Sequence, residues 1–331
     1  MRSYGVNVDA QTVVTVLHAE AVPDPARMAP VTEHATVRCT DAAGLADALD
    51  GAHVLFAFDF LSNALPHAWH AAGSLEWIHV ASAGVDALMF PELRDSDVTV
   101  TNSRGVFDGA IAEYVLAQIL SFVKDLPESL RLQRNRVWKH RESERITGRS
   151  VLVVGSGPIG RAIARLLTAV GMTVRGSGRR AREDDPDFGT VTATEDLPRA
   201  VAEADFVVAA APLTEATRHL FDARIFAAMP PHARFVNVGR GELVHTADLV
   251  EALRSGTIAG AALDVFETEP LSDDHPLWEM PNVVITPHNS GDFIGWRDTL
   301  VDLFVDNFHR RLAGEPLRNV VDKQLGYVRG T

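Results

Sequence analysis

The chain has 331 residues, which is too long for one ordinary domain and enough for two, each with its own hydrophobic core. Its 31 lysine and arginine residues are outnumbered by 44 aspartate and glutamate residues, and the net charge of −13 with no basic tract argues against a nucleic acid partner. The single cysteine, Cys39, excludes an intrachain disulfide, and neither a membrane span nor a signal-peptide core is visible. We therefore expect a soluble cytoplasmic protein.

Short apolar runs alternate with helical patterns through the first hundred residues. Helical patterns are predicted at 41–50 and 64–73, and strands at 12–19, 53–58, 77–82 and 98–102. Such alternation is typical of a parallel sheet with crossover helices.

A charged segment at 121–146 has no obvious place in a sheet and contains Trp138. The pattern allows a solvated surface helix. Alternatively, it is an arm that packs on a second subunit, with Trp138 as an aromatic anchor.

The run VLVVGSGPIGRAIARLL at 151–167 joins a buried strand to a helix through three glycines. Gly155 permits the tight turn, Gly157 lets a pyrophosphate approach the backbone, and Gly160 lets the helix pack closely on the strand. The start of the helix would direct free amides and its positive dipole end at the pyrophosphate. The sequence therefore predicts a dinucleotide site lined by Gly155, Ser156, Gly157, Pro158, Ile159 and Gly160.

Further strands are predicted at 172–177, 205–212, 233–239, 260–266 and 282–288, and the acidic run at 183–187 is most simply a solvated turn. Too few residues follow His288 for a second domain, so the tail is expected to return to the N-terminal part. We expect a substrate-binding domain of residues 1–101 plus 289–331 and a nucleotide domain of residues 102–288. The ligand would bind in the crevice between them, at the carboxyl ends of the strands.

The end of the second strand of the nucleotide domain bears on the choice of cofactor. A carboxylate about 20 residues after the glycines usually binds the ribose 2′-hydroxyl of NAD. Here the strand ends instead in Ser177, Gly178, Arg179 and Arg180. The two arginines are either a basic surface pair or a bidentate clamp for a 2′-phosphate. We expect NADP(H) to be preferred, with NAD(H) possible.

Three ionisable residues, Arg240, Glu269 and His288, follow successive strands and are expected at one edge of the sheet. Each alone has an ordinary structural explanation, but together they suit hydride transfer to a 2-oxo acid. Arg240 could hold the carboxylate and carbonyl with its planar fork, and His288 could protonate the developing alkoxide. Glu269 at the far ring nitrogen would fix the tautomer and favour the imidazolium. No metal site is predicted.

The sequence from Val236 to His288, with GSGPIG and APLTEATRHL at 211–220, closely resembles the D-isomer-specific 2-hydroxyacid dehydrogenase family. The resemblance covers about residues 77–325. It implies an α/β protein with two Rossmann-like or flavodoxin-like domains, parallel sheets and an interdomain active site. It also implies an NAD(P)-dependent oxidoreductase, usually a homodimer, in which Arg240 binds substrate, Glu269 orients the histidine and His288 acts as acid and base.

The resemblance implies further contacts as well. Asp264 would hold the nicotinamide carboxamide, and the loop at 81–86 would bind the substrate carboxylate through the backbone of Ser82, Ala83 and Gly84. The remaining cofactor-lining positions would be Ala211, Pro212, Thr217, Val238, Gly239, His288, Ser290 and Gly291.

The arginines after Gly178 are similar to those of the NADPH-preferring glyoxylate and hydroxypyruvate reductases of the family, so reduction of such small 2-oxo acids is the leading hypothesis. Glu269 argues against the formate dehydrogenases, which carry glutamine there. Two alternatives stay open: an NAD-linked D-2-hydroxyacid or phosphoglycerate dehydrogenase, and a nucleotide-sensing, corepressor-like binding protein. We expect a homodimer formed through the nucleotide domain and the 121–146 arm, without nucleic acid or membrane partners.

Overall fold

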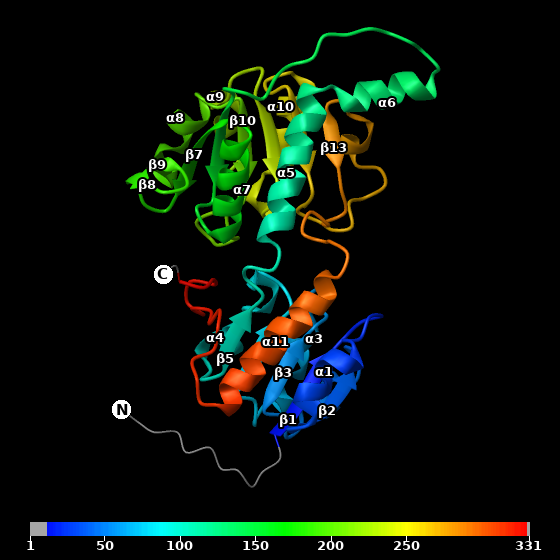
Figure 1. Cartoon of the computed structure of the whole chain (residues 1–331), viewed down its shortest axis with the longest axis vertical. Helices are drawn as coiled ribbons and strands as arrows, with labels where there is room; N and C mark the ends of the chain where they lie inside the picture. The colour runs from blue at the N-terminus through cyan, green and yellow to red at the C-terminus, as the bar shows by residue number, and fades with distance from the viewer. Residues whose placement is uncertain (1–11, 330–331) are drawn as a thin grey trace. The chain divides into compact units, whose positions relative to one another are not determined.

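The computed structural model describes residues 12–329, and the chain forms two compact units (Figure 1). One unit contains the described residues up to Val106 and those from Ile294 onward, and the other runs from Phe107 to Phe293. The two boundaries between the units, 106/107 and 293/294, lie a few residues after the expected boundaries at 101/102 and 288/289. The N-terminal segment that bears on a signal peptide lies outside the described residues. No helix within 12–329 is long and apolar enough to span a membrane.

The first unit contains a five-stranded parallel sheet in the order β2-β1-β3-β4-β5, which is a flavodoxin-like order. Four strands fall within predicted runs: β1 (Thr12–Leu17), β3 (Val54–Ala57), β4 (Trp77–Val80) and β5 (Thr99–Asn102). The edge strand β2 (Ala35–Thr40) was missed because most of its residues are exposed or half-buried and it lacks an apolar run. The helices are α1 (Pro25–Thr32), α2 (Leu45–Leu49), α3 (Ala64–Ala68), α4 (Pro91–Asp95) and α11 (Trp296–Leu312).

Helix α11 explains why the end of the chain returns to this unit. Its Phe304 stacks on Phe56 of β3, with ring centroids 4.2 Å apart, and on Trp77 of β4 at 5.4 Å. Stacked aromatic rings of this size bury a large apolar area, so the helix is held firmly on the sheet.

The second unit contains an eight-stranded sheet in the order β13-β12-β11-β10-β6-β7-β9-β8. Its strands are β6 (Ser150–Val154), β7 (Thr173–Gly178), β8 (Arg182–Asp185), β9 (Gly189–Ala193), β10 (Phe206–Ala209), β11 (Arg234–Asn237), β12 (Gly260–Leu263) and β13 (Val283–Ile285). All pairs are parallel except β8 with β9. The order reverses between β6 and β10, the point at which Rossmann sheets bind nucleotides. The predicted α/β class is confirmed, and the antiparallel β8 is an addition to it.

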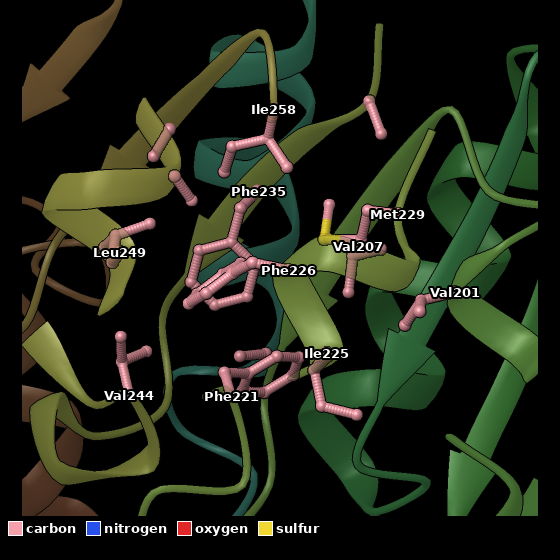
Figure 2. Close-up of a cluster of buried hydrophobic side chains, with 14 of the residues drawn as sticks. Val201, Val207, Phe221, Ile225, Phe226, Met229, Phe235, Val244, Leu249 and Ile258 are labelled. Atoms are coloured by element: carbon pink, nitrogen blue, oxygen red, sulfur yellow. The ribbon is translucent and has the colours of Figure 1, made fainter. Parts of the chain in front are cut away.

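Helices cover both faces of this sheet (Figure 1). α5 (Asp108–Val123) and α7 (Pro158–Ala169) lie on one face, and α8 (Leu197–Val201), α9 (Ala223–Ala228) and α10 (Thr246–Arg254) on the other. Figure 2 shows the apolar core of the second face, where Phe221, Phe226 and Phe235 pack together. α6 (Leu126–Arg134) and the segment after it extend away from the sheet, and Trp138 is fully exposed.

Candidate active site

The glycine loop between β6 and α7 has the shape that a bound pyrophosphate requires. Gly155 has a φ of 121°, and a Cβ on Gly160 would lie 1.8 Å from the Gly155 carbonyl oxygen. Gly157 faces open space instead. The amides of Ser156, Gly157 and Ile159 donate to no acceptor in the described chain. Free amides at a helix N-terminus suit an anion, so these residues fit a dinucleotide.

The end of β7 lies beside this loop and carries no carboxylate. A Cβ on Gly178 would lie 2.8 Å from Ser156 Oγ. The Ser177 hydroxyl is fully buried and has no hydrogen-bond partner within residues 12–329. Arg179 and Arg180 follow with exposed side chains. This strand end therefore offers nothing that would repel a phosphate on the ribose.

Arg182, which the sequence did not single out, lies against the glycine loop. Its Nη2 donates to Ser156 Oγ at 3.0 Å, and its Nε donates to Asp185 Oδ2 at 3.2 Å. Asp185 also accepts two 2.9 Å hydrogen bonds from Arg161 of α7 and one of 3.1 Å from the Asp187 amide. The only hint in the sequence was the proximity of Arg182 to the pair at 179 and 180.

The prediction of a solvated turn at 183–187 is wrong for Asp185. Its side chain is 3% exposed, and the hydrogen bonds from Arg161 lower its pKa to about 2. The β8–β9 hairpin brings this carboxylate against α7, which a linear run of acidic residues could not reveal. Asp185 is therefore a buried anchor for two guanidinium groups.

Glu269 and His288 form a direct hydrogen bond, with Nδ1 and Oε2 2.8 Å apart. The other Glu269 oxygen accepts from the Phe266 amide at 2.9 Å. Partial burial raises the pKa of Glu269, but the hydrogen bonds from His288 and Phe266 outweigh it, so the pKa lies below its ordinary value. The carboxylate therefore stays ionised at neutral pH and accepts a hydrogen bond from the protonated Nδ1 of His288. Nε2 is left to act on a ligand, since it has no partner in the described chain.

The turn that carries His288 is held by Asp264 at the end of β12. His288 has a left-handed φ of 52°. Asp264 Oδ1 accepts from Thr286 Oγ1 at 2.6 Å and from the Asn289 amide at 3.0 Å, and Oδ2 accepts from the Ser290 amide at 2.9 Å. Asp264 is fully buried. Its observed partners are thus in the turn, and the contact with a nicotinamide stays a prediction.

Arg240 follows β11 in a turn that Asn237 shapes. Asn237 Nδ2 donates to the Arg240 carbonyl at 2.9 Å, and its Oδ1 accepts from the Gly239 amide at 3.1 Å. The charge of Arg240 also contributes to lowering the pKa of Glu269. The structure therefore brings Arg240, Glu269 and His288 to the same carboxyl edge of the sheet.

The other predicted cofactor positions lie in loops at that edge. The Thr217 hydroxyl donates to the Pro212 carbonyl at 2.7 Å, so it shapes the loop after β10. Ala211, Val238 and Gly239 are buried, as is Ser290, and a Cβ on Gly291 would lie 3.0 Å from the Phe107 ring.

In the loop after β4 in the first unit, hydrogen bonds hold three backbone carbonyls in place, while the amides of the same residues stay available. The Ser103 amide donates to Ser82 O at 2.9 Å, Asn102 Nδ2 to Ala83 O at 2.5 Å, and Ser82 Oγ to Gly84 O at 2.5 Å. The amides of Ser82, Ala83 and Gly84 have no acceptor among the described residues. Consecutive free amides in a fixed loop form an anion-binding concavity, which suits a carboxylate.

A Rossmann sheet with a phosphate loop and a histidine–glutamate pair at its carboxyl edge defines a dinucleotide-dependent oxidoreductase. Residues 116–290 match the family described as D-isomer specific 2-hydroxyacid dehydrogenase, NAD binding domain. The chain belongs to this family of NAD(P)-dependent enzymes, which confirms the resemblance found in the sequence.

Three relatives illustrate the match. Human glyoxylate reductase/hydroxypyruvate reductase is 34% identical over 75% of this chain and 77% of its own length. A D-isomer specific 2-hydroxyacid dehydrogenase from Xanthobacter autotrophicus, solved with NADPH and MES, is 33% identical with a TM-score of 0.81, covering 96% of this chain and 100% of that one. An NADPH-dependent glyoxylate/hydroxypyruvate reductase from Sinorhizobium meliloti, solved with NADP and sulfate, is 28% identical with a TM-score of 0.81 and the same coverage.

Proposed function

We propose that the chain reduces small 2-oxo acids, such as glyoxylate or hydroxypyruvate, to D-2-hydroxy acids, with NADPH preferred over NADH. The observation that carries the proposal is the 2.8 Å hydrogen bond between His288 and Glu269 at the carboxyl edge of the Rossmann sheet. The relatives named as glyoxylate and hydroxypyruvate reductases support the choice of substrate class.

When bound, the reduced nicotinamide supplies a hydride to the carbonyl carbon of the acid. His288 donates a proton from Nε2 to the carbonyl oxygen, where negative charge develops. Glu269 keeps the Nδ1 proton in place and stabilises the charged ring before it donates. Arg240 binds the carboxylate and carbonyl through its planar fork.

The preference for NADPH rests on the residues around the end of β7. Arg182 is fixed beside Ser156 of the glycine loop, while Arg179 and Arg180 offer two further exposed guanidinium groups. A guanidinium binds a phosphate monoester with charge-assisted hydrogen bonds, and one already held in place loses little conformational entropy on binding. The NADPH and NADP complexes of two relatives support the same choice.

We also propose a homodimer formed through the nucleotide unit and the 121–146 arm. α6 and the following segment extend away from the sheet and carry Trp138 and Val137, which are 101% and 49% exposed. An aromatic side chain so fully exposed is a suitable anchor for an interface.

A panel of 2-oxo acids assayed with NADPH and NADH in parallel tests the function. We expect reduction of glyoxylate or hydroxypyruvate with kcat/KM at least about tenfold higher with NADPH, the worth of one charge-assisted contact. The His288→Ala variant should lose at least about 100-fold in kcat. Faster turnover of 3-phosphoglycerate with NAD would support the NAD-linked alternative. Cofactor binding without any reduction would support a corepressor-like protein.

A further inference from the structure

A side chain on α5, far from His288 in the sequence, is connected to the turn that carries it. The Tyr114 hydroxyl lies 2.7 Å from Thr286 Oγ1. The same Thr286 oxygen lies 2.6 Å from Asp264 Oδ1. A continuous chain of polar groups therefore joins α5 to the carboxylate that holds the amides of Asn289 and Ser290.

The chemistry of these groups determines which group donates and which accepts in each of these hydrogen bonds. Both side-chain oxygens of Asp264 accept from backbone amides, so they act as acceptors, and the Thr286 hydroxyl donates its single hydrogen bond to Oδ1. Thr286 can then only accept from Tyr114, so the phenol donates to Thr286 Oγ1. Burial raises the pKa of Tyr114 to about 12, so the phenol keeps its proton across the neutral range.

This series of hydrogen bonds ends at a strained point in the backbone, at His288. His288 has a φ of 52°, a left-handed conformation that costs a non-glycine residue free energy and persists only where its surroundings hold it. The surroundings here are the Asp264 backbone carbonyl, which accepts from the His288 amide at 2.8 Å, and the Asp264 carboxylate, which binds the next two amides. The orientation of that carboxylate therefore determines where the imidazole lies relative to Glu269.

We propose that Tyr114 is a positioning residue for His288 and acts through Thr286 and Asp264. The Tyr114 hydroxyl donates to Thr286 Oγ1, and the Thr286 hydroxyl donates to one oxygen of Asp264. The Asp264 carboxylate in turn accepts from the amides of the turn that carries His288. The proposal rests on the catalytic role proposed for His288, but the geometry that carries it is independent of the substrate.

Four variants test this series of hydrogen bonds. Tyr114→Phe removes one oxygen and keeps the ring, Thr286→Val keeps the shape without the hydroxyl, and Thr286→Ser keeps the hydroxyl as a matched control. The fourth variant combines Tyr114→Phe with Thr286→Val. With glyoxylate and saturating NADPH, Tyr114→Phe should lower kcat by about threefold to tenfold, the worth of one hydrogen bond. Thr286→Val should lower it more, and Thr286→Ser should stay within about twofold, as expected when the hydrogen bond is kept.

The double variant should be no slower than Thr286→Val alone, because Tyr114 acts only through the Thr286 hydroxyl. Tyr114→Phe and Thr286→Val should also move the alkaline limb of the kcat/KM profile to lower pH, because a displaced imidazolium is held less well by Glu269. If the variants only reduced the fraction of folded protein, kcat/KM would fall at every pH and the alkaline limb would stay at the same pH. Additive effects in the double variant, or an unmoved limb, would overturn the proposal.

A measurement without cofactor or substrate separates this proposal from the proposed function. In ¹⁵N-histidine spectra of the free protein, the His288 signals are identified by their loss in His288→Gln. We expect these signals to shift in Tyr114→Phe and Thr286→Val and to stay in place in Thr286→Ser. If the wild type reduces no 2-oxo acid, the function is wrong, while the shifts still decide the positioning role. If the enzyme is active but the His288 signals do not shift in the variants, the positioning role of Tyr114 is rejected and the proposed function stands.

Discussion

Asp185→Asn removes one negative charge from the cluster that holds Arg182 beside the glycine loop. The carboxylate accepts two hydrogen bonds from Arg161, one from Arg182 and one from the Asp187 amide. An amide of the same size cannot accept the bidentate pair, so both guanidinium groups lose a fixed partner. We expect a less stable nucleotide unit and a higher KM for NADPH, with the KM for NADH unchanged.

The size of the stability loss follows from the pKa of Asp185, which Arg161 lowers from 3.8 to about 2. At about 1.4 kcal/mol per pKa unit, the ionised side chain contributes roughly 2.5 kcal/mol at pH 7. Because the folded pKa is the lower one, this contribution is complete above about pH 4 and disappears as the pH falls through about 2. At pH 3 about half of it should remain.

Urea unfolding followed by circular dichroism at pH 7 and pH 3 measures this contribution. Asp185→Asn should lower the free energy of unfolding by about 2.5 kcal/mol at pH 7 and by about half as much at pH 3. Asp184→Asn is the matched control, because Asp184 is exposed and asparagine tolerates its left-handed φ of 56°. Equal stability of Asp185→Asn and wild type at pH 7 would refute the reasoning, as would a difference that grows in acid.

Three further predictions concern the proposed site and assembly. Glu269→Gln should lower kcat by about tenfold to 100-fold and move the alkaline limb of reduction to lower pH, and an unmoved profile would exclude the dyad. Arg182→Ala should raise the KM for NADPH about tenfold and spare NADH, while Arg165→Ala, farther along α7, should change neither; equal effects on both cofactors would contradict the 2′-phosphate role. Trp138→Ala should shift a dimer toward monomer in light scattering, and an unchanged mass would exclude it as the anchor.

Most strands could be predicted because they are buried on both faces and therefore form continuous apolar runs. β6 and β10 are examples, since nearly all their residues are buried. β2, β8 and β9 escaped prediction because most of their residues are exposed or half-buried, so they form no apolar run. β2 and β8 lie at sheet edges, where polar residues are tolerated. An edge strand is defined by the neighbour it pairs with, and a local pattern does not contain that neighbour.

The candidate site divides in a similar way. Arg240, Glu269 and His288 could be placed together because each follows a parallel strand, and such strands end at one edge. Tyr114 could not be connected to them, because its contact with Thr286 depends on how α5 packs on the sheet. No spacing rule connects two segments so distant in the chain.

Arg182 and His288 share a physical arrangement that a sequence alone cannot show. Each is a half-exposed or exposed group with a proposed role toward ligand, and each is fixed by a buried aspartate that accepts several hydrogen bonds, Asp185 in one case and Asp264 in the other. Fixing such a group before the ligand arrives reduces the entropy lost on binding, and the buried carboxylate is stable only because all its donors are present. A solvated aspartate and a buried one look the same in sequence. The donors that distinguish them, Arg161 for Asp185 and Thr286 for Asp264, are assembled only by the fold.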